Sequence, residues 1–202
     1  MKLEEIFLDS YEMAKKLADD FGRLLILIVL GLIPILDLIV VGYGYKIVQS
    51  GKRDLPELDS YFELFINGLK IFVVALIYFI SPLLIIFLAI GVGSYIILAP
   101  LMFVAISLLF LLAIVAAIGI VHMIVNDNMA KAFALGEIIG IISKIGWGKY
   151  IVWLIAVLVI SIALTAIQSL PYIGWLISGA LTPFYTVFVA RASYLIYMEA
   201  QL

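Results

Sequence analysis

Long apolar runs alternate with shorter polar stretches along this chain. The apolar runs cover approximately residues 24–45, 71–90, 101–125, 150–168 and 175–197. A helix needs about 18–20 consecutive apolar residues to cross the hydrocarbon layer of a bilayer, and most of these runs reach that length. The pattern therefore predicts an all-α integral membrane protein, a helical bundle that crosses the membrane several times.

The first polar stretch, residues 2–22, predicts an amphipathic surface helix. Its apolar residues recur at steps of three, four or seven, and charged residues occupy the positions between them. A helix with that pattern lies in the interface between water and hydrocarbon. We expect it to end at Gly22, before Arg23 and the next apolar run. The apolar positions are Leu3, Ile6, Phe7, Met13, Ala14, Leu17 and Phe21.

The second polar stretch, residues 42–70, is the longest and predicts another surface helix. Asp54 and Glu57 stand three positions apart, which is typical of a capped helix start. We expect this helix to end at a C-cap formed by Gly68, because glycine favours the backbone conformation found there. The next apolar run then begins at Lys70.

A third stretch, residues 128–145, again carries scattered charges, and Gly146 and Lys149 lead into the apolar run that follows. Each stretch thus begins the same order of parts: surface helix, glycine, basic residue, apolar ascent, turn and apolar descent. We expect three such hairpin units within one membrane domain, 1–202. The units are roughly 1–50, 51–126 and 127–202. Alternatively, the likeness reflects only the general placement of Gly and Lys at the ends of membrane helices.

The first unit is too short for two ordinary crossings. Pro34 and Asp37 divide residues 24–45 into arms of about 12–13 residues, or roughly 18–20 Å as helix, against about 30 Å of hydrocarbon. Three arrangements satisfy this length: a re-entrant pair, two short tilted crossings, or one proline-kinked crossing. We favour a pair of short helices, which gives about six membrane helices in total.

Composition supports the membrane class and excludes others. Hydrophobic residues make up 66% of the chain and charged residues 13%, with a mean hydropathy of +1.28. Soluble domains are about 45–50% apolar and about 25% charged. A net charge of −2 excludes a nucleic-acid binder of the basic-patch kind, and the absence of cysteine excludes disulfides and thiolate metal sites.

The placement of charge predicts the orientation in the membrane. The basic residues fall within 2–23, 46–70 and 131–149 and at Arg191, whereas the predicted turns 91–100 and 168–183 contain no charged residue. Basic residues accumulate on the cytoplasmic side of membrane proteins. We therefore expect a multi-pass protein of the cell (plasma) membrane with its charged side, N-terminus and C-terminus in the cytoplasm.

Residues of the second polar stretch carry a family resemblance. A Gly-Tyr pair followed by a basic residue, a Leu-Pro-acidic-hydrophobic-Asp segment and a Gly-Leu-Lys re-entry resemble an uncharacterised, mostly archaeal family of multi-pass membrane proteins, domain of unknown function 4013. The likeness implies a similar fold over nearly the whole chain and brings no activity with it. The residues concerned are Gly42, Tyr43, Lys46, Leu55, Pro56, Glu57, Asp59, Gly68 and Lys70.

No catalytic or cofactor-binding motif is recognisable. Gly42-Tyr43-Gly44 lacks the third glycine of the dinucleotide pattern, and Gly148-Lys149 is not followed by Ser or Thr as a phosphate-binding loop requires. A single His without any Cys argues against zinc and haem sites of the usual kinds. We expect no cofactor, no metal ion and no enzymatic activity.

Four polar residues are candidates for function: Asp37, His122, Asp127 and Arg191. An ionisable group at bilayer depth is costly, so Asp37 is either a functional group or a solvated turn residue. His122 is either a proton relay or an interfacial side chain hydrogen-bonded to a carboxylate or carbonyl. Arg191 either snorkels to the interface or pairs with a surface-helix acid. The acids considered are Glu57, Asp59, Glu63 and Asp127.

The function that these features favour is non-enzymatic. We expect the charged side to act through contacts with membrane lipids, with a partner membrane protein or with a second copy of the chain. The alternative is a small transporter or channel for a solute or an ion, which internal repeats and proline-broken helices favour. A water-filled, polar-lined cavity that reaches Asp37, Thr165 or Gln168 would distinguish transport from a solid apolar bundle.

Overall fold

The structure, a computed structural model, describes residues 1–92 and 95–201, and helices joined by short turns make up this part of the chain without any strand. The all-α prediction is confirmed. The helices are α1 (Leu3–Asp19), α2 (Phe21–Leu32), α3 (Asp37–Ser50), α4 (Tyr61–Val92), α5 (Tyr95–Val125), α6 (Leu135–Ile145), α7 (Trp147–Gln168) and α8 (Gly174–Met198), with a 3-10 turn η1 (Met129–Phe133) before α6.

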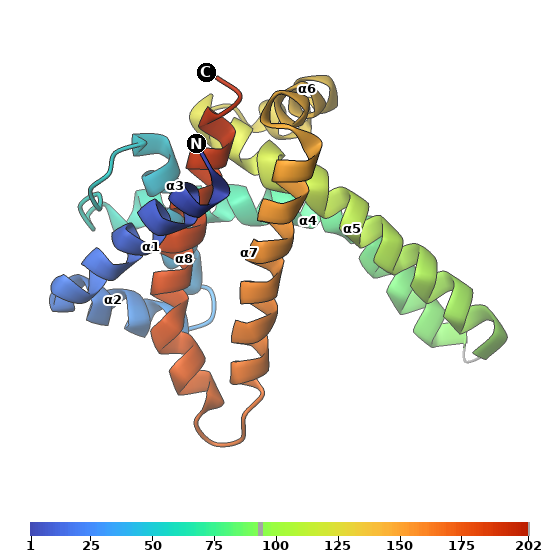
Figure 1. Cartoon of the computed structure of the whole chain (residues 1–202). Helices are drawn as coiled ribbons and strands as arrows, with labels where there is room; N and C mark the ends of the chain where they lie inside the picture. Colours follow the sequence, from blue (N-terminus) through green and yellow to red (C-terminus); the bar gives the residue numbers. More distant parts are fainter. Residues whose placement is uncertain (93–94, 202) are drawn as a thin grey trace.

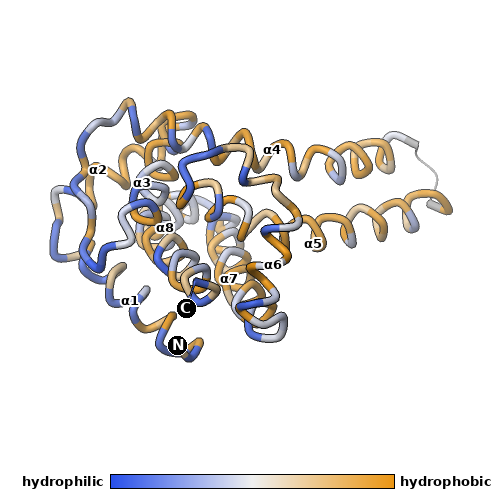
Figure 2. The backbone as a smooth tube through the Cα atoms, turned by 90° about the horizontal axis from the view of Figure 1, so that it is seen from above, coloured by the Kyte–Doolittle hydropathy of each residue, from blue (hydrophilic) through white to orange (hydrophobic). Residues whose placement is uncertain are grey.

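Two long hairpins diverge from a common base. The α7–α8 hairpin points downward in Figure 1, whereas the α4–α5 hairpin points to the lower right, and both termini lie with α6 at the opposite, upper end. Helices α1, α2 and α3 pack against α8. Figure 2 shows that the α4–α5 hairpin is apolar along nearly its whole length. The largest buried side chains gather at the base: Trp153, Tyr43, Tyr45, Tyr150 and Tyr197.

Three helices of the described chain are long and apolar enough to cross a membrane. They span Tyr61–Gly91, Ile96–Val125 and Trp147–Gln168, with 31, 30 and 22 residues. The expected number of about six is not confirmed. Helices α2 and α3 have 12 and 14 residues, or roughly 18 and 21 Å, which is short of the hydrocarbon thickness of about 30 Å. The prediction that the first unit folds as a pair of short helices agrees with these lengths.

The amphipathic helix α1 buries its apolar face against protein. Ile6 and Leu17 are fully buried, and the Phe7 ring stacks on Phe188 of α8 with the ring centroids 6.1 Å apart. The expectation that this face meets the lipid interface is therefore only partly right, because α8 covers much of it. The helix also ends earlier than Gly22, since the Asp20 side chain accepts a hydrogen bond from the Arg23 backbone N–H at 3.0 Å and starts α2.

The predicted surface helix between Asp54 and Gly68 is right only for residues 61–68, which form the first turns of α4. Residues 51–60 have no helix, and α4 begins at Tyr61 and continues through Gly68 to Val92 without a C-cap. Side chains from other helices bind the carbonyl groups of residues 51–60, so this segment does not need helical hydrogen bonds. The segment is called the strap below. The predicted turn 91–100 is shorter in the structure: α4 ends at Val92, directly after Gly91, whereas Pro100 lies inside α5, which begins at Tyr95, and Gly93 lies outside the described residues.

The third surface stretch folds as predicted. Helix α6 buries Ile138, Ile141 and Ile142 on one side, and it ends at Gly146, whose φ of 94° suits a residue without a side chain. Helix α7 then begins at Trp147.

Helices α3 and α4 touch through their backbones at two buried glycines. A Cβ atom added to Gly42 would lie 1.7 Å from the Leu64 carbonyl oxygen, and one added to Gly68 would lie 1.9 Å from the Leu38 carbonyl oxygen. Glycine is thus required for contact here and not for a helix end. Close approach of this kind is a common way to pack helices where lipid removes the hydrophobic driving force.

Replacing Gly42 by alanine is expected to destabilise the fold, because α3 and α4 must separate to admit the methyl group. Overpacking typically costs about 1–3 kcal/mol. The measurement is the thermal unfolding midpoint of the detergent-solubilised protein. Gly136→Ala is the matched control, since a Cβ there meets no atom within 4 Å. Equal midpoints for the two variants would contradict the backbone contact.

Candidate functional site

Ion pairs gather at one end of the molecule, which we call the charged face. It comprises the polar side of α1, the start of α2 with Asp20 and Arg23, Lys46 of α3, the strap, residues 126–137, Lys149 and the last turns of α8. Every ion pair of the described residues lies here. Glu199 pairs with both Lys149 and the N-terminal ammonium, so the first and last turns of the chain meet.

The family-like residues of α3 hold the strap. The Tyr43 hydroxyl donates to the Pro56 carbonyl at 2.9 Å, and Arg23 Nη1 donates to the same carbonyl at 3.2 Å. One turn later Lys46 Nζ donates to the Glu57 carbonyl at 2.9 Å and pairs with Asp59. Leu55 packs against the core. These residues thus form one structural clamp.

Lys46 also sets the charge state of its partner. Its hydrogen bond lowers the pKa of the Asp59 carboxyl below the ordinary value, although partial desolvation opposes this. Lys70, which the sequence placed at the start of an apolar run, lies inside α4. Its ammonium group stands over the Tyr45 ring, 5.5 Å from the ring centroid, and donates to the Asn67 side chain at 3.2 Å.

Arg191 is buried, with 4% of its surface exposed, and joins three parts of the chain. Its Nε donates to Asp9 Oδ1 at 2.6 Å, and its Nη1 donates to the carbonyls of Gly51 and Lys52 at 3.1 and 3.0 Å. The expected ion pair is therefore present, but the acid is Asp9 of α1 and none of the four considered. Arg53 also pairs with Asp9, at 3.2 Å.

Arg191→Gln is expected to destabilise the fold by about 3 kcal/mol, because removing one member of a buried pair leaves the other poorly compensated. Arg53→Gln is the control: its side chain is 81% exposed, and exposed pairs contribute about 0–1 kcal/mol. Chemical unfolding of both variants, with and without Asp9→Asn, gives the coupling energy. Additive effects of Asp9→Asn and Arg191→Gln would argue against the pair.

His122 lies at the centre of a hydrogen-bonded cluster on the charged face. Its Nδ1 lies 2.8 Å from the Tyr197 hydroxyl, and its Nε2 lies 2.8 Å from Glu137 Oε2. Lys131 Nζ donates to both oxygens of Glu137, at 2.7 and 2.8 Å. The cluster connects α5, η1, α6 and α8. Glu137 is a carboxylate partner of the kind expected if His122 is an interfacial, hydrogen-bonded side chain. Nearby, Asp127 has a positive φ of 45° and accepts a hydrogen bond from the Tyr45 hydroxyl at 3.2 Å.

Attachment of α6 to α5 is expected to weaken in acid. The hydrogen bond from Lys131, followed by that from His122, lowers the pKa of Glu137 below its ordinary value of 4.5. The unfolded carboxyl therefore binds a proton first, and the stabilisation present above pH 4.5 is lost as the pH falls through the lowered pKa.

Hydrogen exchange of the α6 amides as a function of pH measures this loss. In Glu137→Gln, the α6 amides should exchange faster at neutral pH and should show no further loss of protection in acid. Glu12→Gln, a change at an exposed α1 residue, should lose protection in acid as the parent protein does. Identical pH profiles in the parent protein and Glu137→Gln would contradict the role of this carboxylate.

Asp37 lies away from the charged face, directly after the turn between α2 and α3. It lines a cavity of about 280 Å³ between the short hairpin and the α7–α8 hairpin. The cavity is rich in polar groups: Asp37, Gln168, Ser178, Thr182 and Thr186. Asp37 forms no side-chain ion pair with any residue of the described chain. No group of three or more His, Cys, Asp or Glu residues suited to a metal ion occurs in residues 1–92 and 95–201.

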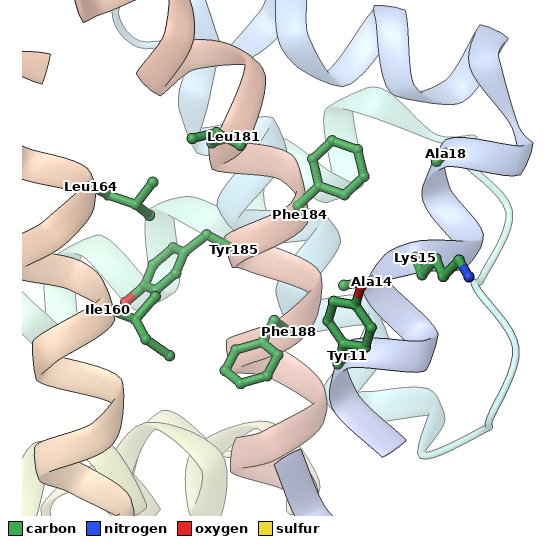
Figure 3. Close-up of a pocket in the computed structure, with 10 residues that line it drawn as sticks. All are labelled: Tyr11, Ala14, Lys15, Ala18, Ile160, Leu164, Leu181, Phe184, Tyr185 and Phe188. Carbon is green, nitrogen blue, oxygen red and sulfur yellow. The ribbon is translucent and has the colours of Figure 1, made fainter. Parts of the chain in front are cut away.

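A second hollow, of about 500 Å³, is an apolar groove on the face of α8. Figure 3 shows it flanked by α7 on one side and by α1 on the other. Its lining is almost wholly apolar, and Lys15 of α1 stands at its edge with an exposed side chain. The other lining residues are Tyr11, Ala14, Ala18, Ile160, Leu164, Leu181, Phe184, Tyr185 and Phe188.

Several partners in these sites could not be chosen from the sequence. Asp9, Arg23 and Tyr197 all bind candidate residues that are far away in sequence. The polar face of α1 offers many carboxylates, and nothing in their spacing distinguishes Asp9. A signal did exist for the groove, because the small residues Ala14 and Ala18 recur at a helical step of four beside Lys15.

The described chain is all-helical, and three of its helices are long and apolar enough to span a membrane, which indicates a membrane protein. The chain belongs to the family described as protein of unknown function (DUF4013), whose model matches residues 24–173. That match includes every residue that carried the resemblance. No curated protein and no solved structure matches the chain.

Proposed function

We propose that the protein is a multi-pass protein of the cell membrane that binds anionic phospholipid beside its charged face and catalyses no reaction. The charged face would lie in the cytoplasm, as the distribution of basic residues favours. The meeting of the first and last turns of the chain at Glu199 supports an even number of crossings. Helix α8 would then supply a fourth crossing beside α4, α5 and α7.

The groove in Figure 3 is the observation that carries this proposal. It begins beneath α1, a helix at the level of the charged face, and continues along α7 and α8 toward the hydrocarbon layer. Its apolar lining suits an acyl chain, and Lys15 at its edge suits a phosphate group. Lys15 has no ion-pair or hydrogen-bond partner in residues 1–92 and 95–201, whereas the adjacent Lys16 pairs with Asp54 at 2.8 Å.

The exposed apolar surface of α4 and α5 supports contacts within the membrane. Phe72, Phe87 and Phe103 are 51%, 76% and 73% exposed, and this hairpin meets the rest of the molecule mainly near its base. Lipid chains, a partner membrane protein or a second copy of the chain would cover this surface.

Binding of phosphatidylglycerol, an anionic lipid, tests the proposal against phosphatidylcholine, which has no net charge. Native mass spectrometry of the purified protein should show that Lys15→Gln weakens phosphatidylglycerol binding about fivefold, since one basic group near an anionic surface contributes about 1 kcal/mol. Phosphatidylcholine binding should change little. Ala18→Phe, which narrows the groove, should weaken both.

Lys144→Gln is the matched control. Lys144 is an exposed lysine of α6 outside the groove, and no ion pair is formed by it within the described residues. If Lys144→Gln weakened phosphatidylglycerol binding as much as Lys15→Gln did, the attraction would be general, and the groove would not be the site.

A second candidate function, passage of a small solute, has one specific observation in its favour. The polar cavity at Asp37 shares Val41 and Thr186 with a further cavity of about 290 Å³ among α3, α4, α5, α7 and α8. The inner cavity reaches Tyr45, whose hydroxyl contacts Asp127 on the charged face. The two cavities therefore adjoin, and together their lining residues extend from Asp37 to Tyr45.

A further inference from the structure

The cavity at Asp37 lies along the outer half of α8, the half away from the charged face. Trp175 and Thr186 both line it, and these positions are 11 residues apart, which corresponds to roughly 16 Å of helix. Leu32, at the end of α2, packs so closely on Gly179 that a Cβ there would lie 2.3 Å from Leu32 Cδ2. The turn that carries Asp37 is thereby fixed against α8.

The charge of Asp37 has no counter-ion among residues 1–92 and 95–201, because all Lys and Arg residues that form ion pairs there do so on the charged face. The Asp37 side chain is exposed and is not enclosed by the protein core. The positive end of the α3 dipole faces it, but a helix dipole balances only a fraction of a full negative charge. A bound cation would supply the missing charge.

We propose that this cavity binds a small monovalent cation, with the Asp37 carboxylate as its counter-ion. A single carboxylate balances a single positive charge. The side-chain oxygens of Gln168, Ser178, Thr182 and Thr186 provide acceptors, which hard cations and ammonium groups both use. Thr182 already donates its hydroxyl hydrogen to the Ser178 carbonyl at 2.8 Å, so its oxygen is available as an acceptor.

The size and the aromatic wall of the cavity favour an organic ammonium ion. A volume of about 280 Å³ is many times the share of one water molecule in the liquid, about 30 Å³, so a bare ion would not fill it. Trp175 lines the cavity, and tryptophan is the best aromatic partner for a quaternary ammonium group. The site deepens the second candidate function, but binding there does not require transport.

Tetramethylammonium is a suitable probe, and tert-butanol is its neutral counterpart of similar shape. A saturation-transfer NMR titration of the protein in lipid nanodiscs should show saturable binding of tetramethylammonium and none of tert-butanol. Asp37→Asn should weaken binding about tenfold or more, as expected for loss of a charged partner. Ser178→Leu, which fills the cavity, should abolish it. Asp19→Asn, the same change at an exposed residue outside the cavity, should bind like the parent.

Displacement of tetramethylammonium by sodium chloride would show that an inorganic monovalent cation shares the site, and lack of displacement would restrict it to organic ammonium ions; both results keep Asp37 as the counter-ion. Undiminished binding in Asp37→Asn would overturn the proposal, as would failure of the parent to bind either cation. Uptake of tetramethylammonium into liposomes separates cation binding at Asp37 from solute passage. Binding without uptake supports the site and rejects solute passage.

Discussion

Helix α3 is packed closely on two sides, against the backbone of α4 and against side chains of α8, and the positions of both inner cavities depend on this. Gly42 brings it against α4, and Gly44 brings it against α8, where an added Cβ would lie 3.0 Å from Thr186 Cγ2. A helix of 14 residues is too short to be fixed by the membrane itself. Close packing therefore fixes the position of α3, whereas the length of the apolar run fixes the positions of α4, α5 and α7. The same contact places Asp37 at the cavity and Tyr43 at the strap.

The sequence predicted the membrane class, the surface helix α6 and the pairing of α2 with α3, because these features follow from run length and periodicity. It failed for the segment after Gly51. Asp54 and Glu57 have the spacing of a helix cap, but Arg23, Tyr43 and Lys46 occupy the carbonyls of this segment instead. Tertiary hydrogen bonds thus replaced the local ones on which capping rules depend.

Glycine was the other source of error. At Gly68 the sequence indicated a helix end, whereas the structure uses the missing side chain to admit a neighbouring carbonyl. In a single sequence, a glycine is equally compatible with a helix end and with close contact by the backbone of a neighbouring helix. The ion pair of Arg191 was likewise predictable only in part. A buried guanidinium needs a carboxylate, but the choice of Asp9 depended on how α1 crosses α8.

The strap has an energetic consequence of its own. Its carbonyl groups accept hydrogen bonds from side chains of four helices, α1, α2, α3 and α8, so it lacks the cooperative hydrogen bonding that protects a helix. Segments of that kind open at a fraction of the global unfolding free energy. Release of the strap would remove two of the acceptors that hold the Arg191 guanidinium, whereas the Asp9–Arg191 ion pair and the Phe7–Phe188 stack would still hold α1 on α8. The earliest native-state opening should therefore be a local release of the strap, while α1 stays on α8 and the α4–α5 hairpin remains folded.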